Sequence, residues 1–400
     1  MDLELARRLS VSNGSRILLF VIDGLGGLPH PQTGRSELET ARTPNLDALA
    51  RESACGFTLP VAPGVTPGSG PGHLALFGYD PLTFNIGRGA LEAVGVDFDL
   101  RPQDVAARGN FCTVDSSGAI TDRRAGRISS ERCAELCAKL REIRLDGAEL
   151  FVEPVREYRF VFVLRGEGLS DAVTDTDPQR EGAAPLEPRA TSPEGEATAR
   201  LVARFVEEAK RIPAPESPAN MLTLRGFARR PDWPSVADVF KLRPAAVAHY
   251  PMYRGLAKLV GMEALAVGPA IGDSIATVRE NWGRFDYFFV HCKYTDTAGE
   301  DGDFDRKVAK LEEVDAALPS LLELGPDVLL VAGDHSTPAV MAAHSWHPVP
   351  FIMRAPWTRS DACDAFNEVA LQKGSLGTFP AMEALPLALA HAGRLTKYGA

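Results

Sequence analysis

The last third of the chain concentrates side chains that bind metal ions. The segments HCKYTDTAGEDGD, GDHSTP and AHSWHPVP carry aspartates, glutamates and histidines, and three of the eight histidines fall within thirteen residues. Carboxylates mixed with imidazoles, without thiolates, suit Mn²⁺, Zn²⁺ or Mg²⁺ better than a structural zinc or an iron–sulfur centre. Asp296 and Glu300 are four residues apart, so one turn of helix would direct both side chains at the same point. The alternative is a set of solvated loop charges and helix caps, which adequately explains Asp303.

Ser69 lies in a glycine-rich turn, GVTPGSGPGHLALFGYD, which an apolar, helix-like stretch follows. A serine at the N-terminus of a helix has exposed backbone donors and a favourable dipole for an anion or an alkoxide. The turn is not a P-loop, a dinucleotide fingerprint or a Gly-x-Ser-x-Gly elbow, because the residues and spacings of those motifs are absent. Taken alone, it is better explained by an ordinary loop.

Asp23, Ser69 and the late Asp/His set change this interpretation when they are taken together. Asp23 follows the first apolar run, and with the late segments it completes a set of about six or seven ligands, which is what two metal ions need. A serine oxygen bound to a metal ion loses its proton near neutral pH, as metal-bound water does. Two cations would also stabilise the oxygens of a transferring phosphoryl group. The combination predicts phosphoryl transfer by Ser69.

Short apolar runs predict the strands that must position these side chains: Ile17–Ile22, Tyr287–Val290, Val328–Ala332 and Val349–Met353. Runs without alternation are typical of strands that are covered on both faces. Amphipathic helices separate them, which predicts an α/β fold with a mostly parallel sheet and helices on both faces. In such sheets ligands bind outside the carboxyl ends of the strands, where we expect Asp23, His291, Asp334 and His335.

Two helices have predictable ends. Thr43-Pro44 predicts an N-cap followed by a proline at the first helical position, and Gly56 is expected to end that helix. Asp303 is expected to cap a second helix that runs from about Phe304 to Leu324.

The pattern of the chain changes at about residue 109. A strand is followed by a helix over Glu131–Arg141 and by a hairpin-like pair of runs, Phe151–Val155 and Phe160–Leu164. This order predicts a smaller α+β module inserted into the α/β domain. We expect a discontinuous catalytic domain over residues 1–109 and 181–400, and an inserted, substrate-covering domain over residues 110–180.

The composition of the chain indicates which kinds of molecule the protein binds. Of the 400 residues, 45% are apolar and 24% charged, which is ordinary for a globular protein, and the formal net charge is −10. An acidic chain is a poor binder of nucleic acid, although a locally basic pocket can still hold a small anion. The six cysteines form no Cys-x-x-Cys pair, which predicts reduced thiols. No apolar segment is long enough to span a membrane or to serve as a signal peptide, so we expect a cytoplasmic protein without a membrane partner.

The order of the motifs resembles a known family. Asp-Gly after the first strand, TPGSGPGHLALFGYDP, GRGALEA, TDRRAGRI, PMYRGLAKLVGM, HCKYTDTAGEDGD, GDHSTP and AHSWHPVP together resemble the cofactor-independent (2,3-bisphosphoglycerate-independent) phosphoglycerate mutases of the archaeal type. The resemblance covers residues 15–395 approximately. That group belongs to the alkaline phosphatase superfamily, so the resemblance implies an alkaline phosphatase-like metal domain with a smaller inserted domain.

The resemblance also implies two divalent metal ions per protomer, Mn²⁺ first and Zn²⁺, Mg²⁺ or Co²⁺ as alternatives. One ion is implied to bind Asp23, Ser69, Asp334 and His335, with Ser69 as the phosphorylated nucleophile. The other is implied to bind Asp296, Glu300 and His344. Glu300 departs from the family pattern, which carries histidine at this position. A glutamate adds a negative charge and favours oxygen-loving metals.

The implied activity is the interconversion of 3-phosphoglycerate and 2-phosphoglycerate, a step of glycolysis and gluconeogenesis, through a phosphoserine. A small phosphorylated three-carbon acid needs cations, and arginine binds phosphate and carboxylate bidentately. The candidates for substrate binding are His73, Arg88, Arg124, Arg254, Lys258 and Lys293, with Arg123 and Arg127 in the same motif as Arg124. Two alternatives stay open: a metal-dependent hydrolase of the same superfamily, such as a phosphomonoesterase, and a catalytically silent relative that binds a metabolite. Homo-oligomerisation is also left open.

Overall fold

The computed structural model describes residues 1–399, which form two compact units. Unit 1 comprises residues 1–85 and 233–399, and unit 2 comprises residues 86–232. The insertion is therefore wider than the 110–180 expected from the sequence. The reason is a strand pairing that links distant segments: β3 (Val105–Val114) pairs antiparallel with β7 (Met221–Ala228), which draws both flanks of the expected module into unit 2.

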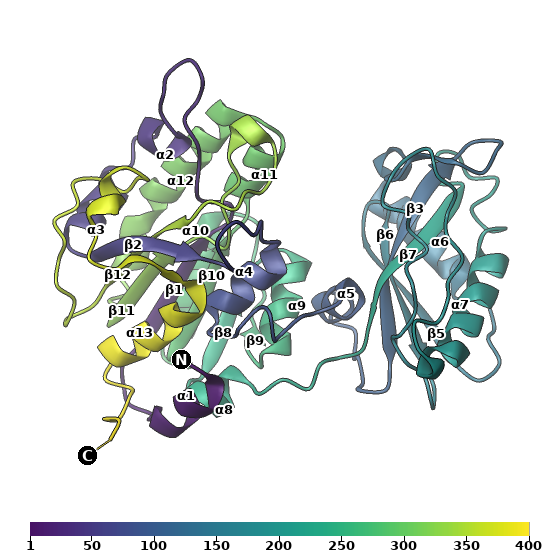
Figure 1. Cartoon of the computed structure of the whole chain (residues 1–400), viewed down its shortest axis with the longest axis horizontal. Coiled ribbons are helices and arrows are strands. Elements are labelled where there is room, and N and C mark those ends of the chain that lie inside the picture. The colour runs from purple at the N-terminus through teal and green to yellow at the C-terminus, as the bar shows by residue number, and fades with distance from the viewer. Residues whose placement is uncertain (400) are drawn as a thin grey trace. The chain divides into compact units, whose positions relative to one another are not determined.

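Unit 1 is built on an eight-stranded sheet with the order β13-β2-β12-β11-β1-β10-β8-β9 (Figure 1). Only one of these strands, β12, runs against the others, so the sheet is mostly parallel, as predicted. The strands are β1 (Ile17–Ile22), β2 (Ala54–Leu59), β8 (Pro244–Val247), β9 (Glu263–Ala264), β10 (Tyr287–Cys292), β11 (Val328–Ala332), β12 (Val349–Arg354) and β13 (Gly377–Pro380).

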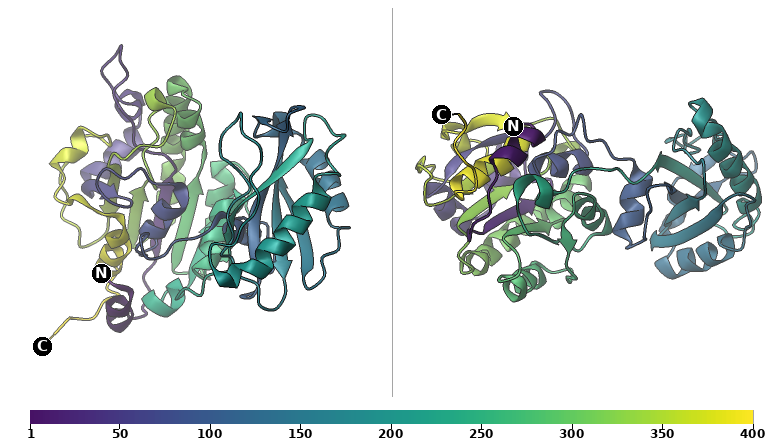
Figure 2. Two further views of the ribbon diagram at one scale, coloured as in Figure 1. Left: turned by 45° about the vertical axis from the view of Figure 1, so that its right-hand side comes forward. Right: turned by 90° about the horizontal axis from the view of Figure 1, so that it is seen from below.

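Helices cover both faces of this sheet (Figure 2). On one face α3, α10 and α12 pack with Leu18, Phe20 and Ile22 of β1, while on the other Phe77 beyond α4 contacts Phe289 of β10. All six residues of β1 are buried, which explains its unbroken apolar run. The helices of unit 1 are α1 (Leu3–Leu9), α2 (Glu37–Thr40), α3 (Pro44–Arg51), α4 (Ser69–Leu76), α8 (Val236–Phe240), α9 (Pro251–Leu259), α10 (Ile271–Asn281), α11 (Tyr294–Glu300), α12 (Phe304–Leu322) and α13 (Ala384–His391).

Two local expectations for unit 1 are corrected. Helix α3 ends at Arg51, and Gly56 lies within β2, where a Cβ atom would meet the carbonyl oxygen of Gly377 at 2.4 Å. Gly56 is therefore a point of close strand approach rather than a helix end. Strand β10 continues to Cys292, so His291 lies inside the strand. Asp303 caps α12 as predicted, by accepting a hydrogen bond from the Arg306 backbone N–H.

Unit 2 is an antiparallel five-stranded sheet with helices, the α+β composition that the sequence predicts. Its core contains Phe111, Phe160 and Phe162 of the sheet, together with Val202 and Phe205 of α7. The remaining elements of unit 2 are α5 (Arg88–Gly95), β4 (Ile120–Asp122), α6 (Ser130–Leu140), β5 (Glu149–Arg156), β6 (Arg159–Arg165) and α7 (Glu196–Ala209). Over the described part of both units, no helix combines the length and the apolar character that a bilayer span requires. The six cysteines are unpaired and buried.

Candidate active site

Three neighbouring strands deliver acidic side chains to one edge of the sheet of unit 1. Asp23 follows β1, Asp334 follows β11, and Asp296 lies on α11 shortly after β10; all three side chains are buried. Gly24 allows the close approach of these segments. It has a φ of 66°, and a Cβ atom there would lie 2.8 Å from the Cα of Asp296. The predicted edge of the sheet is therefore where the carboxylates meet.

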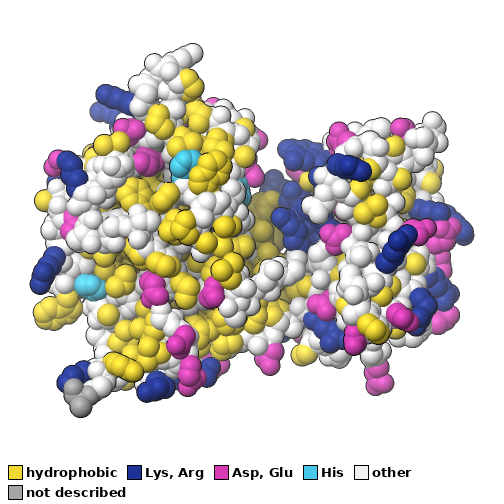
Figure 3. All heavy atoms as spheres, in the orientation of Figure 1, with side chains coloured by type: hydrophobic (Ala, Val, Ile, Leu, Met, Phe, Trp, Pro, Cys, Tyr) yellow, Lys and Arg dark blue, Asp and Glu magenta, His cyan; other side chains and the backbone are white. Residues whose placement is uncertain are grey.

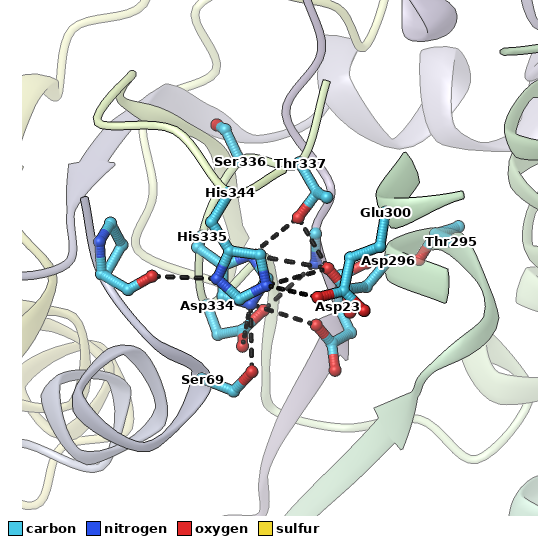
Figure 4. Close-up of polar contacts among 12 residues, drawn as sticks. Asp23, Ser69, Thr295, Asp296, Glu300, Asp334, His335, Ser336, Thr337 and His344 are labelled. Carbon is cyan, nitrogen blue, oxygen red and sulfur yellow. Dashed lines mark hydrogen bonds and ion pairs between the residues drawn. The ribbon is translucent and has the colours of Figure 1, made fainter. Parts of the chain in front are cut away.

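A first group of ligand atoms comes from Asp23, Asp334 and His335, which all lie within 4.8 Å of one another (Figure 4). His335 Nε2 is 3.1 Å from Asp334 Oδ2 and 3.4 Å from Asp23 Oδ1. Ser69, the first residue of α4, brings its Oγ to 3.1 Å from the same nitrogen. The glycine turn and the late Asp-His pair, 266 positions apart, thus meet at one point.

A second group is formed by Asp296, His335 and His344. His344 stacks on His335 with 3.6 Å between ring centroids, and its Nε2 is 3.4 Å from Asp296 Oδ1 and 3.6 Å from Glu300 Oε1. Asp296 and Glu300 lie one turn apart on α11, the arrangement that their spacing predicts. The Glu300 side chain is the outermost of the set, since 53% of it is exposed.

The donor set fits divalent cations. Asp23 Oδ1 and Asp334 Oδ2 are buried, and within residues 1–399 neither accepts a hydrogen bond of good geometry. Burial would raise the pKa of Asp334, but His335 and His73 hold it well below its ordinary value. Burial acts in the same direction on Asp296, and there His344, Lys293 and His335 lower the pKa. Ionised, buried carboxylates with unused oxygens are what a hard cation requires.

The pKa of His344 is shifted in the opposite direction. Burial alone would lower it, but hydrogen bonding to Asp296 and Glu300 raises it to about 10. In the metal-free protein this imidazolium, together with the ammonium of Lys293, supplies positive charge to the carboxylates. Lys293 Nζ lies 3.3 Å from Asp23 Oδ2 and also pairs with Asp296. Lys293 was predicted to bind substrate, and it stands among the candidate ligands with 21% of its side chain exposed.

His73, also predicted to touch the substrate, lies beside the Ser69 turn. The side chain is fully buried, and its Nδ1 donates to the Ser69 carbonyl oxygen at 2.8 Å and lies 3.2 Å from Asp334 Oδ2. His291 Nε2 lies 3.0 Å from Asp23 Oδ2 on the same side of the sheet. Both imidazoles are therefore buried and contact carboxylates of the site.

The two remaining predicted cations of unit 1 lie on α9. Arg254 is partly buried and donates to the Leu265 carbonyl oxygen at 3.2 Å. Lys258 is one turn further along, and burial lowers its pKa.

Unit 2 contains a cluster of arginines that sequence reasoning only partly identified: Arg88, Arg108, Arg123, Arg159 and Arg225. Arg108 faces Arg225 across the β3–β7 pair. Burial, followed by repulsion from neighbouring arginines, lowers the pKa of Arg88 and Arg225. Carboxylates lie among these guanidinium groups and act in the opposite direction: Glu92 and Asp175 raise the pKa of Arg88, and Asp177 and Asp175 raise that of Arg225. Figure 3 shows that Lys and Arg side chains also gather on one side of this unit.

Arg124, preferred over Arg123 from the sequence, is exposed, whereas Arg123 donates to Asp177 Oδ2 at 2.9 Å and joins the cluster through this contact. The Nε atoms of Arg123 and Arg225 are buried and lack a hydrogen-bond partner within the described residues, whereas Arg108 Nε lies 3.3 Å from Glu92 Oε1. The one sequence signal for Arg108 is a charged side chain inside the strand sequence VAARGNFCTV.

Comparison with known proteins agrees with this geometry. The family model for 2,3-bisphosphoglycerate-independent phosphoglycerate mutase matches residues 50–218. A probable 2,3-bisphosphoglycerate-independent phosphoglycerate mutase of Thermus thermophilus is 52% identical over 406 residues. The alignment covers 100% of both chains. The chain belongs to this family. The family resemblance and the prediction of an enzyme of the phosphoglycerate mutase family, an isomerase, are thereby confirmed.

A further relative and two solved structures are also similar to this chain. A probable member from Aquifex aeolicus is 47% identical over 408 residues, with full coverage of both chains. The cofactor-independent phosphoglycerate mutase from Thermoplasma acidophilum has a TM-score of 0.72 at 30% identity, covering 95% of this chain and 100% of its own. The PH0037 protein from Pyrococcus horikoshii has a TM-score of 0.84 at 27% identity, covering 97% and 100%.

Proposed function

We propose that this phosphoglycerate mutase interconverts 3-phosphoglycerate and 2-phosphoglycerate by two phosphoryl transfers through Ser69. The observation that carries the proposal is the convergence of the Ser69 hydroxyl with His335, Asp334 and Asp23 at one point. Ser69 opens an eight-residue helix, whose N-terminal dipole favours the anionic phosphoryl group.

Two divalent ions, Mn²⁺ in the first place, are proposed to complete the site. Asp23, Ser69, Asp334 and His335 would hold one, and Asp296, Glu300 and His344 the other. Bound there, they would lower the pKa of the serine hydroxyl and stabilise negative charge on the transferring group. Glu300 provides a carboxylate oxygen where the family pattern has an imidazole, which suits a hard ion such as Mn²⁺ or Mg²⁺.

The side chains of the protein determine the course of the two transfers. In the first, the bond between phosphorus and the C3 oxygen of the substrate breaks as a bond to Ser69 Oγ forms. The proton that Ser69 loses is balanced by the one that the C3 oxygen takes up, and the glycerate turns to present its C2 hydroxyl, whose proton returns to the serine in the second transfer. In the second, the phosphoryl group passes from Ser69 Oγ to the C2 oxygen, and the serine regains its proton. His73 and His291 hold the Asp334 and Asp23 carboxylates in place throughout.

Retention of glycerate between the transfers separates a mutase from a hydrolase. The arginine cluster of unit 2, Arg88, Arg108, Arg123, Arg159 and Arg225, is proposed to bind the substrate anions, which guanidinium groups contact bidentately. A site that releases glycerate and admits water would produce inorganic phosphate instead. We also propose that the reaction belongs to glycolysis and gluconeogenesis and takes place in the cytoplasm.

The test incubates the protein with Mn²⁺ and 3-phosphoglycerate and measures 2-phosphoglycerate and inorganic phosphate over time. Wild type is expected to form 2-phosphoglycerate as the main product. Ser69→Ala is expected to abolish both products while leaving Mn²⁺ binding largely in place, and Ser12→Ala, at an exposed serine, serves as control. Phosphate as the dominant product would favour the hydrolase alternative, and turnover by Ser69→Ala would contradict the role of the serine.

A further inference from the structure

Thr337 lies between the two groups of candidate ligands, three residues after Asp334, and its side chain is fully buried. Its Oγ1 is 2.7 Å from Asp296 Oδ1 and 2.9 Å from His335 Nδ1 (Figure 4). We infer that Thr337 is a positioning residue that fixes the proton of His335 on Nδ1 and links the Asp296 and His335 ligands across the metal centre. This inference rests on the proposed function, since it concerns the residues proposed to hold the metal ions.

The assignment of the His335 proton follows from counting donors. A threonine hydroxyl has one proton, and an ionised carboxylate can only accept, so the Thr337 proton goes to Asp296. The remaining contact of Oγ1 is then with a donor, which places a proton on His335 Nδ1. The lone pair that binds a metal ion is consequently on Nε2, the nitrogen that faces Ser69, Asp334 and Asp23.

The backbone of Thr337 is held in place by a buried cation. Lys307 Nζ of α12 donates to the carbonyl oxygen of Thr337 at 2.8 Å and to that of Gly26 at 3.0 Å. Glu37 lies 3.7 Å from this ammonium and accepts a hydrogen bond from the Ala339 backbone N–H at 2.7 Å. The loop after β11 is thus tied to α12 at Thr337 and to α2 at Ala339.

Close packing leaves Thr337 little freedom to move. A Cβ atom on Gly299 would lie 2.3 Å from the Thr337 carbonyl oxygen, and one on Gly24 would lie 2.7 Å from its Oγ1. The backbone and hydroxyl of Thr337 and both hydrogen-bond partners are held in place. Loss of the hydroxyl therefore leaves Asp296 Oδ1 without its donor and the His335 Nδ1–H without its acceptor. Removing such an outer contact from a metal ligand typically weakens metal binding 10–100-fold.

The test compares Thr337→Val, which removes the hydroxyl but keeps the shape, with Thr337→Ser, which keeps the hydroxyl. Mn²⁺ affinity is measured by titration calorimetry, and the visible absorption of bound Co²⁺ reports the ligand geometry. Thr337→Val is expected to bind Mn²⁺ about 10–100-fold more weakly and to change the Co²⁺ spectrum, whereas Thr337→Ser stays close to wild type. Thr58→Val is the control, because Thr58 is buried in β2 of the same unit and its hydroxyl has no hydrogen-bond partner within the described residues.

The outcomes separate this inference from the proposed function. Equal Mn²⁺ affinity and an equal Co²⁺ spectrum in wild type and Thr337→Val would overturn the role of Thr337 and leave the metal site standing. A wild type that binds no Mn²⁺ would overturn the proposed function and the inference together. Thr337→Ala provides a second variant without the hydroxyl, and thermal unfolding of the metal-free proteins confirms that each variant is folded.

Discussion

Lys307 is a fully buried ammonium on α12, and replacing it with methionine is expected to destabilise unit 1 strongly. Burial lowers the pKa of Lys307 below its ordinary value, although the nearby carboxylates of Glu37 and Glu368 act to raise it. The side chain of Glu37 is also 0% exposed, and its Oε2 has no hydrogen-bond partner in residues 1–399. Methionine would preserve much of the side-chain volume but would leave the Glu37 charge buried without a cation.

The expected cost is about 3–5 kcal/mol, the usual consequence of removing one partner from a buried ion pair. For a unit of this size each kcal/mol lowers the unfolding midpoint by about 2–4 °C, so a decrease of about 10 °C is expected. Adding Glu37→Gln to Lys307→Met should recover part of the loss, since the double variant no longer buries the Glu37 charge without a cation, although Glu368 keeps its own carboxyl group.

Tryptophan fluorescence during heating is a suitable assay, because the four tryptophans (Trp233, Trp282, Trp346 and Trp357) all lie in unit 1. Lys310→Met is the matched control on the same helix. Lys310 is 31% exposed and pairs with Glu313, so its loss should cost less than about 1 kcal/mol. If Lys307→Met lowered the midpoint no more than Lys310→Met does, the buried pair would not stabilise this part of the site.

Three further outcomes are expected. Gly24→Ala should reduce Mn²⁺ affinity at least about tenfold in a calorimetric titration, because φ is 66° and the new Cβ would press on Asp296; an unchanged affinity would refute this. Mn²⁺ affinity should rise with pH toward about 10, since binding must displace the proton from His344, whose pKa is raised to about 10; titrations at several pH values would show no such slope if His344 were not a ligand. In the metal-free protein the same shift favours folding below the ordinary histidine pKa, and this contribution is lost as pH rises through about 10. Arg108→Met should raise KM for 3-phosphoglycerate about tenfold or more in steady-state kinetics. Arg124→Met, at an exposed arginine, is the control. Equal KM values for the two variants would contradict substrate binding by the cluster.

The sequence predicted the parts of the fold that local patterns determine. The bounds predicted for β1 and β11 agree with the structure, because both strands are buried on both faces and consist of apolar residues alone. The N-terminus of α12 was equally predictable, since the Asp303 side chain caps it. Asp23, Asp334 and His335 were found because they directly follow such strands.

Features that depend on tertiary contacts were out of reach. Pairing of β3 with β7 sets the extent of unit 2. The local sequence of neither strand predicts that it pairs with a strand more than 100 positions away. The same pairing creates the arginine cluster by placing Arg108 opposite Arg225. The prediction for Gly56 was wrong because the sequence does not distinguish a glycine that permits close strand approach from one that ends a helix. His73 lies beside the glycine turn that contains Ser69, but its burial, which follows from packing against Tyr253 and Phe289, could not be predicted.

The most direct test of the central claim is to find the phosphoryl group on the protein during turnover. Wild type with Mn²⁺ and 3-phosphoglycerate labelled in the phosphoryl group would be quenched in acid within milliseconds and digested, and the peptides analysed by mass spectrometry. A labelled phosphoserine at Ser69 is the expected result, with no label in Ser69→Ala. Formation of 2-phosphoglycerate at the wild-type rate while Ser69 stays unlabelled would contradict the account.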